Sequence, residues 1–217
     1  MSIKVLIADD STLFREGIKS LFGNDGHIVI AGEAANALDA AKQTVAIQPD
    51  VVLLDHDMPG LDCLDAIRLI RDRRPGTEVI VLAEAAPHER ALRVVEAGAS
   101  GYVLKDVGPD DLVRAIVDVC NGCTLMNPRV ARDLVEQFRA LARERKGPDG
   151  GHLSGLSGRE TQILMELAKG ATDREIARTM LVTTTTVKSH IRSIFRKIGV
   201  RNRTQAAVLV FKSGLAH

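Results

Sequence analysis

The sequence has few aromatic residues, few cysteines and no long apolar run. Its 217 residues include no tryptophan, one tyrosine, five phenylalanines and three cysteines. Three cysteines are too few for a disulfide framework, which argues against a small disulfide-rich secreted protein. No apolar run approaches the length of about 20 residues that a membrane-spanning helix needs. The opening "MSIKVLIADD" has no cationic leader before a long apolar core, so we expect no secretion signal, no membrane partner and a cytoplasmic location.

The chain also has little net charge, but the value of +1 hides two oppositely charged parts. Residues 1–127 hold 12 Lys and Arg against 20 Asp and Glu, whereas residues 151–217 hold 11 against 4. An acidic front and a basic back predict two domains with different partners. The basic part is a candidate for nucleic-acid binding.

The front part alternates short apolar runs with amphipathic ones. We expect β-strands at 3–9, 27–33, 50–55, 78–83 and 101–105. Helical periodicity places helices near 12–22, 36–47, 62–73, 87–97 and 109–121. Five strand–helix units in series predict an open parallel sheet, doubly wound with helices on both faces.

Carboxylates stand at the ends of these predicted strands. Asp9 and Asp10 end the first strand, Asp55 ends the third in "VVLLDHDMPG", and Lys105 ends the fifth. Ligands of open parallel sheets bind beyond the carboxyl ends of the strands, so these side chains should meet at one edge. Three carboxylates cannot all ionise cheaply without a cation, and Mg²⁺ suits their oxygen ligands. Asp55 is then a natural nucleophile for a phosphoryl group, to which Lys105 supplies a second positive charge.

Three motifs in the front part carry a family resemblance: the acidic pair Asp9–Asp10, "LLDHDMPG" around Asp55, and "AGASGYVLKD" at 97–106. With them, residues 1–122 resemble the receiver domain of two-component response regulators, which has a flavodoxin-like fold. The resemblance implies phosphotransfer from a partner histidine kinase to Asp55. It also implies Mg²⁺ held by Asp10, Asp55 and the backbone carbonyl of Asp57, with Asp9 supporting that site.

The chain departs from the receiver pattern at several positions. Receivers usually carry Ser or Thr at the end of the fourth strand, where this sequence has Ala83. The resemblance implies that this hydroxyl binds the phosphoryl group and that the aromatic residue of the fifth strand, here Tyr102, follows its loop. Its absence predicts weakened phosphate control, and an atypical receiver that acts independently of phosphorylation stays open as an alternative. We expect His56 to be a solvated loop residue and Cys63 a packing residue.

Two other patterns suggest weaker alternatives. Asp55 and Asp57 form an Asp-x-Asp pair that resembles the nucleophile and acid of haloacid-dehalogenase phosphatases, but that chemistry needs further catalytic loops that we do not find. Cys120 and Cys123 have the Cys-x-x-Cys spacing of redox and zinc sites. This pair falls at a predicted helix C-terminus with Gly122 as the stop, and no second pair exists to complete a metal site, which favours a structural role.

Residues 123–152 are expected to connect the two domains. An apolar stripe predicts a helix through Val130, Leu134, Phe138 and Leu141. The stretch 147–155, "GPDGGHLSG", is rich in glycine and predicts a flexible joint.

The last part, residues 153–217, has the pattern of a small all-helical domain. Helix caps are predicted at Ser157, at Thr172 with Glu175 three residues later, and at Thr183. The helix that follows Thr183 has an apolar face with Val187, Ile191, Ile194, Phe195 and Ile198. Its opposite face carries Thr185, Lys188, Ser189, Arg192 and Arg196. A short helix, a tight turn and such a second helix form the arrangement that enters a DNA major groove.

This run resembles the LuxR/GerE helix-turn-helix at Leu156, Arg159, Glu160, Gly170, Glu175, Ile176, Ala177, Val187, Lys188, His190 and the "RTQA" of 203–206. Essentially the whole chain then resembles the NarL/FixJ class of response regulators. The resemblance implies double-stranded DNA as a partner, with base edges facing Lys188, Ser189 and Arg192. Residues nearer the phosphates would be Thr185, Thr186, His190 and Arg196. It also implies a homodimer on DNA, with a contact through the last helix at Val208 and Phe211.

Overall fold

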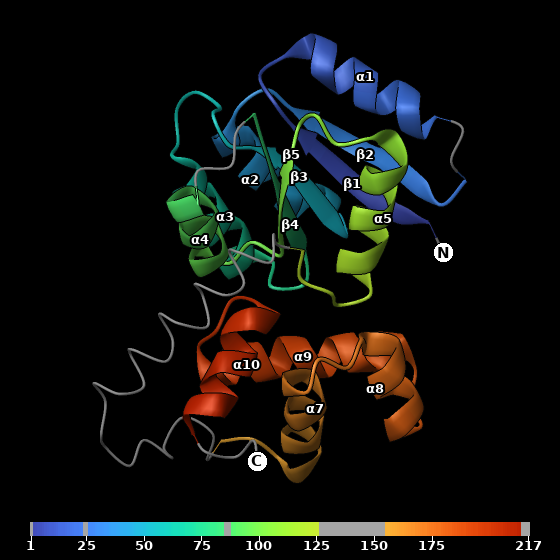
Figure 1. Ribbon diagram of the computed structural model, residues 1–217, viewed down its shortest axis with the longest axis vertical. Helices are drawn as coiled ribbons and strands as arrows, with labels where there is room; N and C mark the ends of the chain where they lie inside the picture. The colour runs from blue at the N-terminus through green and yellow to red at the C-terminus, as the bar shows by residue number, and fades with distance from the viewer. Residues whose placement is uncertain (1, 24–25, 85–87, 126–154, 214–217) are drawn as a thin grey trace. The chain divides into compact units, whose positions relative to one another are not determined.

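The structure is a computed structural model that describes residues 2–23, 26–84, 88–125 and 155–213 (Figure 1). At 88–89 and 211–212 it describes the backbone alone. The chain divides into two compact units, Met1–Met126 and Asn127–His217. The connector helix predicted around Val130–Leu141, and most of the joint predicted at 147–155, lie outside the described residues. The domain boundaries predicted at 122 and 153 stay predictions.

The first unit contains one five-stranded parallel sheet with the order β2-β1-β3-β4-β5. Its strands are β1 (Ile3–Ala8), β2 (Ile28–Ala34), β3 (Val51–Asp55), β4 (Glu78–Ala83) and β5 (Gly101–Leu104). Every residue of β3 is buried, as its uninterrupted apolar sequence predicts for a central strand. The chain leaves β1 for β2 on one side and later returns to β3 on the other, so the winding reverses between β1 and β3. That reversal is where open parallel sheets bind their ligands.

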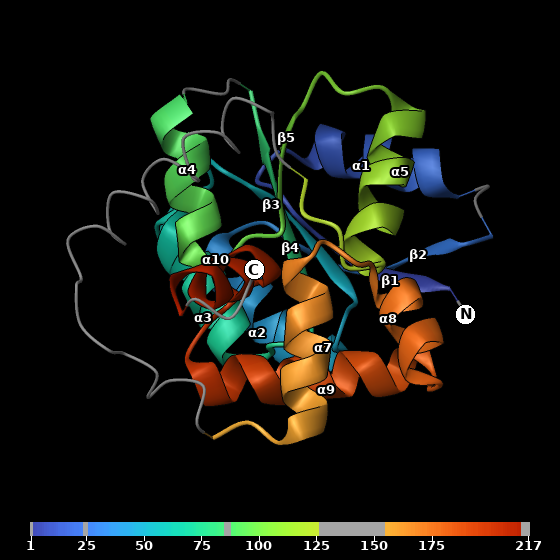
Figure 2. The ribbon, with the colours of Figure 1, turned by 60° about the horizontal axis from the view of Figure 1, so that its bottom comes forward.

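Helices cover both faces of the sheet, as predicted (Figures 1 and 2). They are α1 (Thr12–Phe22), α2 (Ala37–Ile47), α3 (Cys63–Arg73), α4 (His88–Ala97) and α5 (Pro109–Cys120). Apolar side chains of α1 and α5 pack on one face of the sheet, with Ile18 and Ile116 in that layer. Those of α2, α3 and α4 pack on the other face, with Ala40, Ile67 and Val94. Alternate residues of the strands supply the two layers, because successive strand side chains point to opposite faces.

The second unit consists of α7 (Gly158–Ala168), α8 (Asp173–Met180), α9 (Thr184–Ile198) and α10 (Arg203–Lys212). Capping boxes start α7 at Ser157 and α8 at Thr172, and the Thr183 side chain caps α9. These caps satisfy backbone N–H groups that a helix start leaves unpaired. A tight turn at Leu181, which has φ 54° and ψ 44°, separates α8 from α9. The predicted helix-turn-helix is therefore present. None of the helices described in either unit has the length and apolar character needed to cross a membrane.

Candidate functional site

Three of the predicted acids meet at the carboxyl edge of the sheet. Asp9 and Asp10 follow β1, and Asp55 ends β3. Their carboxylate oxygens lie within 4.8 Å of one another. Asp9 and Asp55 are buried, whereas Asp10 is exposed at the mouth of the cluster. The structure thus brings these acids together as the position of the strand ends predicts.

Lys105 directly follows β5 and lies between two of these acids. Its Nζ is 2.8 Å from Asp9 Oδ2 and 3.0 Å from Asp55 Oδ1. Burial raises the pKa of Asp55, and the ammonium group of Lys105 opposes that rise. Burial also acts to lower the pKa of Lys105, but its contacts with Asp9 and Asp55 outweigh this and raise it. Lys105 therefore stays charged and stabilises the ionised carboxylate that a nucleophile requires.

The acid cluster fits a divalent cation. Asp9 Oδ2 is buried and lies against the ammonium group of Lys105, its partner among the described residues. A carboxylate oxygen has more than one lone pair, so this single contact leaves it able to accept a further ligand. Within the described residues, Lys105 pairs with Asp9 and Asp55 but not with Asp10. Carboxylate oxygens in negative excess form the donor set that Mg²⁺ prefers.

Ala83 and Tyr102 are the two positions through which the resemblance implies a response to phosphate. Ala83 ends β4 and is 0 % exposed, and its carbonyl accepts a hydrogen bond from Lys105 N at 2.9 Å. Tyr102 lies in β5, and burial raises the pKa of its hydroxyl. The backbone N–H of Asp57, whose carbonyl is a predicted metal ligand, lies 3.5 Å from Asp55 Oδ1. The bond between Lys105 and Ala83 joins the ends of β4 and β5, and the contact of Asp57 N is local to the end of β3.

The expectation that His56 is a solvated loop residue was wrong. Its side chain is only 15 % exposed. The ring lies edge-on to that of Tyr102, with centroids 6.5 Å apart, and its Nδ1 is 3.0 Å from Asp57 Oδ1. Position in a loop did not predict exposure here, because the neighbouring strand β5 places Tyr102 beside the ring.

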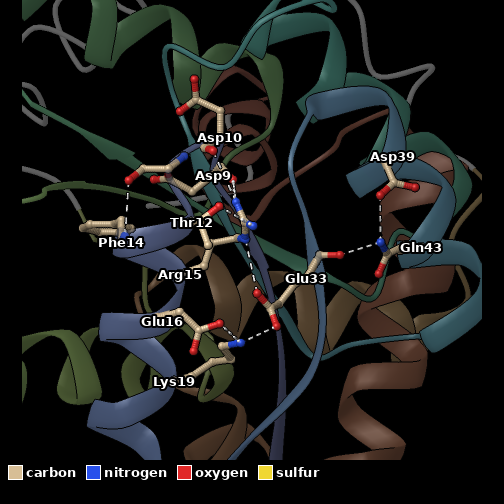
Figure 3. Close-up of polar contacts among 11 residues, drawn as sticks. Asp9, Asp10, Thr12, Phe14, Arg15, Glu16, Lys19, Glu33, Asp39 and Gln43 are labelled. Carbon is tan, nitrogen blue, oxygen red and sulfur yellow. Dashed lines mark hydrogen bonds and ion pairs between the residues drawn. The ribbon is translucent and has the colours of Figure 1, made fainter.

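Sequence patterns did not single out three residues that support the cluster. The ring of Phe14 lies under Lys105, with Nζ 4.7 Å from the ring centroid. Arg15 Nη1 donates to the backbone carbonyl of Asp9 at 2.8 Å, and Arg15 Nε donates to Glu33 Oε2 at 3.2 Å (Figure 3). Closeness of Phe14 and Arg15 to the acidic pair was a usable signal. Nothing in the spacing indicated Glu33, which reaches Arg15 from β2.

The second candidate surface is the outer face of α9. Of the residues predicted to face inward, Val187, Ile194, Phe195 and Ile198 are buried, and Ile191 packs against them half-buried. The predicted DNA-facing residues are accessible. Thr185, Ser189, Arg192 and Arg196 are exposed, and Thr186, Lys188 and His190 are partly exposed. This helix therefore presents the polar and basic face that its periodicity predicts.

A buried acid on α7 anchors the inner side of α9. Glu160 Oε1 accepts a hydrogen bond from Ser193 Oγ at 3.0 Å, and Glu160 Oε2 lies 2.7 Å from Lys197 Nζ. Oε2 also accepts from Ser157 N at 2.8 Å, which completes the cap of α7. The bond with Lys197 and then the bond with Ser157 N lower the pKa of Glu160 to about 2. The carboxylate of Glu160 thus completes the cap at the start of α7 and holds α9 against that helix.

We expect Glu160→Gln to lower the free energy of unfolding of the second unit by about 2 kcal/mol at neutral pH, because bonds to a charged group are lost. Since folding lowers the pKa of Glu160, this stabilisation is present above its ordinary value of 4.5 and disappears as the pH falls towards about 2. The difference in free energy of unfolding between Glu160→Gln and wild type should therefore shrink as the pH falls from 4.5 towards about 2. Hydrogen exchange of peptides from α7 and α9 in the full chain measures it.

The control for this prediction is Glu166→Gln, because the ion pair of Glu166 within the described residues is an i,i+3 pair with the exposed Lys169. Such surface pairs contribute little to stability. Equal hydrogen-exchange protection in Glu160→Gln and wild type at neutral pH would show that the anchor is unimportant.

The remaining candidate residues have the following positions. Cys63 is buried, which raises the pKa of its thiol to about 12, so it has the environment of the expected packing residue. None of the three cysteines, which all lie in the described part of the chain, forms a disulfide. Helix α5 ends at Cys120 ahead of Gly122 with φ 87°, as predicted. Val208 is half-buried on α10. The side chain of Phe211 lies outside what the structure describes.

Comparison with known proteins matches both units. Residues 5–117 match the response regulator receiver domain, and residues 154–210 match the luxR family of bacterial regulatory proteins. The DNA-binding transcriptional activator DevR/DosR of Mycobacterium tuberculosis is 35% identical over 206 residues, which cover 95% of this chain and 93% of that protein. The nitrate/nitrite response regulator protein NarP of Escherichia coli is 35% identical over 209 residues, with the same coverage of both chains.

A solved structure agrees with these relatives. The response regulator ChrA of a heme-sensing two-component system is 31% identical, with a TM-score of 0.51, and the match covers 99% of this chain and 98% of that one. The acidic cluster on the parallel sheet and the helix-turn-helix fall within the two matched segments. The chain therefore belongs to the transcriptional response regulators of two-component systems, which join a receiver domain to a LuxR-type DNA-binding domain.

Proposed function

We propose that phosphorylation of Asp55 by a partner histidine kinase controls this regulator. The observation that carries the proposal is the position of Lys105 Nζ, 3.0 Å from Asp55 and 2.8 Å from Asp9, beside the third carboxylate of Asp10. A carboxylate oxygen of Asp55 attacks the phosphorus of the kinase's phosphohistidine. The new P–O bond forms as the P–N bond breaks, and the imidazole leaves with the electron pair. The ammonium group of Lys105 offsets the negative charge on the phosphoryl oxygens.

The same proposal includes a Mg²⁺ site in the acid cluster. Asp10, Asp55 and the backbone carbonyl of Asp57 would hold the ion, and Asp9 would support them. When bound, Mg²⁺ supplies positive charge that offsets repulsion between the carboxylates and the phosphoryl group. The buried Asp9 Oδ2, which keeps a lone pair beyond its contact with Lys105, supports this site. Asp9 also accepts a hydrogen bond from Ser11 N at 2.8 Å through Oδ1, which fixes its carboxylate in the cluster.

We further propose that the chain binds double-stranded DNA as a homodimer through α9. Base edges would face Lys188, Ser189 and Arg192, and phosphates would lie nearer Thr185, Thr186, His190 and Arg196. A contact between the two α10 helices would include Val208 and Phe211. The polar and basic face of α9 is accessible, and residues 151–217 hold 11 basic and 4 acidic residues. Both observations support DNA as the partner.

The DNA interface predicts different effects for base-facing and phosphate-facing residues. Lys188→Ala and Arg192→Ala should each cost about 1–3 kcal/mol at a specific site, because each removes a base contact. Arg196→Ala should weaken all sequences about equally and lower the salt slope by about one. Salt-titrated binding to specific and scrambled duplexes measures both effects. Arg68→Ala, an exposed basic residue on α3, is the matched control. If Arg192→Ala prefers the specific duplex as strongly as wild type does, the assignment of Arg192 to base contacts in the major groove is wrong.

Genome-wide mapping of bound DNA, with wild type and Asp55→Ala compared, tests the proposed function as a whole. We expect discrete sites whose occupancy by wild type rises when the kinase is active, and Asp55→Ala should not respond. A second candidate is an atypical receiver that regulates DNA binding independently of phosphorylation, which the buried Ala83 favours. Equal occupancy by both proteins under all conditions would support that candidate.

The proposed role is not enzymatic, and it is cytoplasmic, as expected from the sequence. One relative is a DNA-binding transcriptional activator and another is a response regulator, which favours this over the phosphatase alternative. Sustained turnover of a phosphate ester by the purified chain would instead support a phosphatase that uses Asp55 and Asp57.

A further inference from the structure

We propose that Arg15, braced by Glu33, is a positioning residue for divalent-cation binding. It fixes the segment Asp9–Ser11, called the acid loop below, in the shape that the cation requires. The inference rests on the proposed function of the acid cluster. It concerns two residues that neither contribute a ligand nor contact the phosphoryl acceptor in the described structure.

Arg15 folds back from α1 onto the acid loop (Figure 3). Its Nη1 donates to the carbonyl oxygen of Asp9 at 2.8 Å and to that of Asp10 at 3.3 Å. Its Nη2 donates to Thr12 Oγ1 at 3.2 Å. The side chain is 13 % exposed, which is low for an arginine. A rigid guanidinium fork with this many bonds holds both carbonyls in one fixed arrangement.

Asp10 depends on this contact more than Asp9 does. Asp9 N donates to Ala34 O at 3.1 Å, which extends the pairing of β1 with β2, and its carboxylate accepts from Ser11 N. Among the residues that the structure describes, Arg15 donates the hydrogen bond that Asp10 receives. Asp10 is also the exposed member of the cluster. Without Arg15, the loop that carries this carboxylate loses its tether.

Glu33 holds Arg15 in place and offsets its charge. Glu33 Oε2 accepts from Arg15 Nε at 3.2 Å, and Glu33 Oε1 lies 2.7 Å from Lys19 Nζ. The contacts with Lys19 and then Arg15 lower the pKa of Glu33, so it is ionised at neutral pH. Glu16 also pairs with Lys19, so two carboxylates offset the two positive charges beside the acid loop. This matters because an unpaired guanidinium would repel a cation bound on the other side of the loop.

Charge and positioning predict opposite effects for one substitution. If Arg15 acted on the cation only through its charge, Arg15→Met would tighten cation binding. If it positions Asp10, Arg15→Met should weaken binding despite the lost repulsion. Glu33→Gln should weaken binding in either case, because it leaves the guanidinium uncompensated and less well held. The sign of the Arg15→Met effect therefore decides between the two.

The test is a titration of the unphosphorylated full chain with Mn²⁺, which replaces Mg²⁺ as the probe, followed by electron paramagnetic resonance of the free ion. We expect Arg15→Met to raise the Kd about tenfold, at the low end of the 10–100-fold losses typical for residues that orient metal ligands. Arg15→Lys keeps the charge but not the fork, so it should recover only part of the affinity. Lys19→Met is the matched control. It lies on the same helix and pairs with the same Glu33, but it does not contact the acid loop.

A second measurement separates positioning from general destabilisation. The rate of phosphorylation by acetyl phosphate should need about tenfold more Mg²⁺ in Arg15→Met and reach the wild-type maximum at saturation. A loss of structure alone would lower the maximum instead. If Arg15→Met is unfolded at the assay temperature, Arg15→Lys and Glu33→Gln carry the test. An unchanged or lower Kd in a folded Arg15→Met overturns the inference. A wild type that binds no Mn²⁺, or an Asp10→Asn that binds as well as wild type, overturns the proposed metal site itself.

Discussion

Wild-type protein treated with acetyl phosphate and Mg²⁺ should gain one phosphoryl group, and Asp55→Asn should gain none. The amide of Asn is not a nucleophile, so the expected loss is complete rather than partial. In wild type, the ion pair with Lys105 at 3.0 Å keeps the carboxylate ionised although burial raises its pKa. Intact-protein mass spectrometry counts the phosphoryl groups directly.

The matched control for this prediction is Asp65→Asn. Asp65 is a carboxylate of the same unit that pairs with Arg68 on the surface of α3. The Asp65→Asn variant should be phosphorylated at Asp55 as readily as wild type. Omission of Mg²⁺ should suppress the reaction in both proteins, because Lys105 pairs with Asp9 and Asp55 and leaves the charge of Asp10 uncompensated. Phosphorylation that persists in Asp55→Asn, or that ignores Mg²⁺, would show that the site is assigned wrongly.

Ala83→Thr should strengthen the coupling between phosphorylation and DNA binding. Ala83 ends β4 beside the acceptor and is fully buried, and its methyl group cannot donate the hydrogen bond that receivers usually supply here. A hydrogen bond to a charged group contributes about 1.5–3 kcal/mol, so its absence should weaken coupling on the order of ten- to a hundredfold. Phosphate capture should survive, because Asp55, Lys105 and the acids remain. We therefore expect substantial DNA binding without phosphate and a weak response to it.

The measurement is DNA affinity with and without beryllofluoride, a phosphoryl mimic, for wild type and Ala83→Thr. Ala83→Val is the control, since it adds nearly the same volume at this buried site without a hydroxyl group. Beryllofluoride should change the DNA affinity of Ala83→Thr more than that of wild type. If Ala83→Val shows no such increase, the gain is assigned to the hydrogen bond of the Thr hydroxyl. The inference fails if wild type already gains a hundredfold or more and Ala83→Thr adds nothing. In that case Glu84 or a water molecule completes the relay.

The order and the limits of the secondary structure in the first unit follow from local sequence patterns. Each predicted strand and helix of the first unit lies within one residue of its observed ends. Apolar periodicity and local caps such as Asn36 at α2 set these limits, and both act between residues close in the chain. The meeting of Asp9, Asp10 and Asp55 was also predictable. Parallel strands carry their last residues to one edge, whatever the details of packing.

Which polar groups pair inside each unit depends instead on how its helices and strands pack. Glu160 meets Ser193 and Lys197, 33 and 37 residues away, and Arg15 meets Glu33 across 18 residues. Spacing along the chain contains no signal for such pairs, because they depend on which helix face lies against which neighbour. His56 shows the same limit, since the packing of Tyr102 beside it, rather than its place in a loop, determined its burial. Local periodicity therefore specified the elements and the acid cluster, whereas the contacts that hold Arg15 against Glu33 and α9 against Glu160 arise only when distant elements pack together.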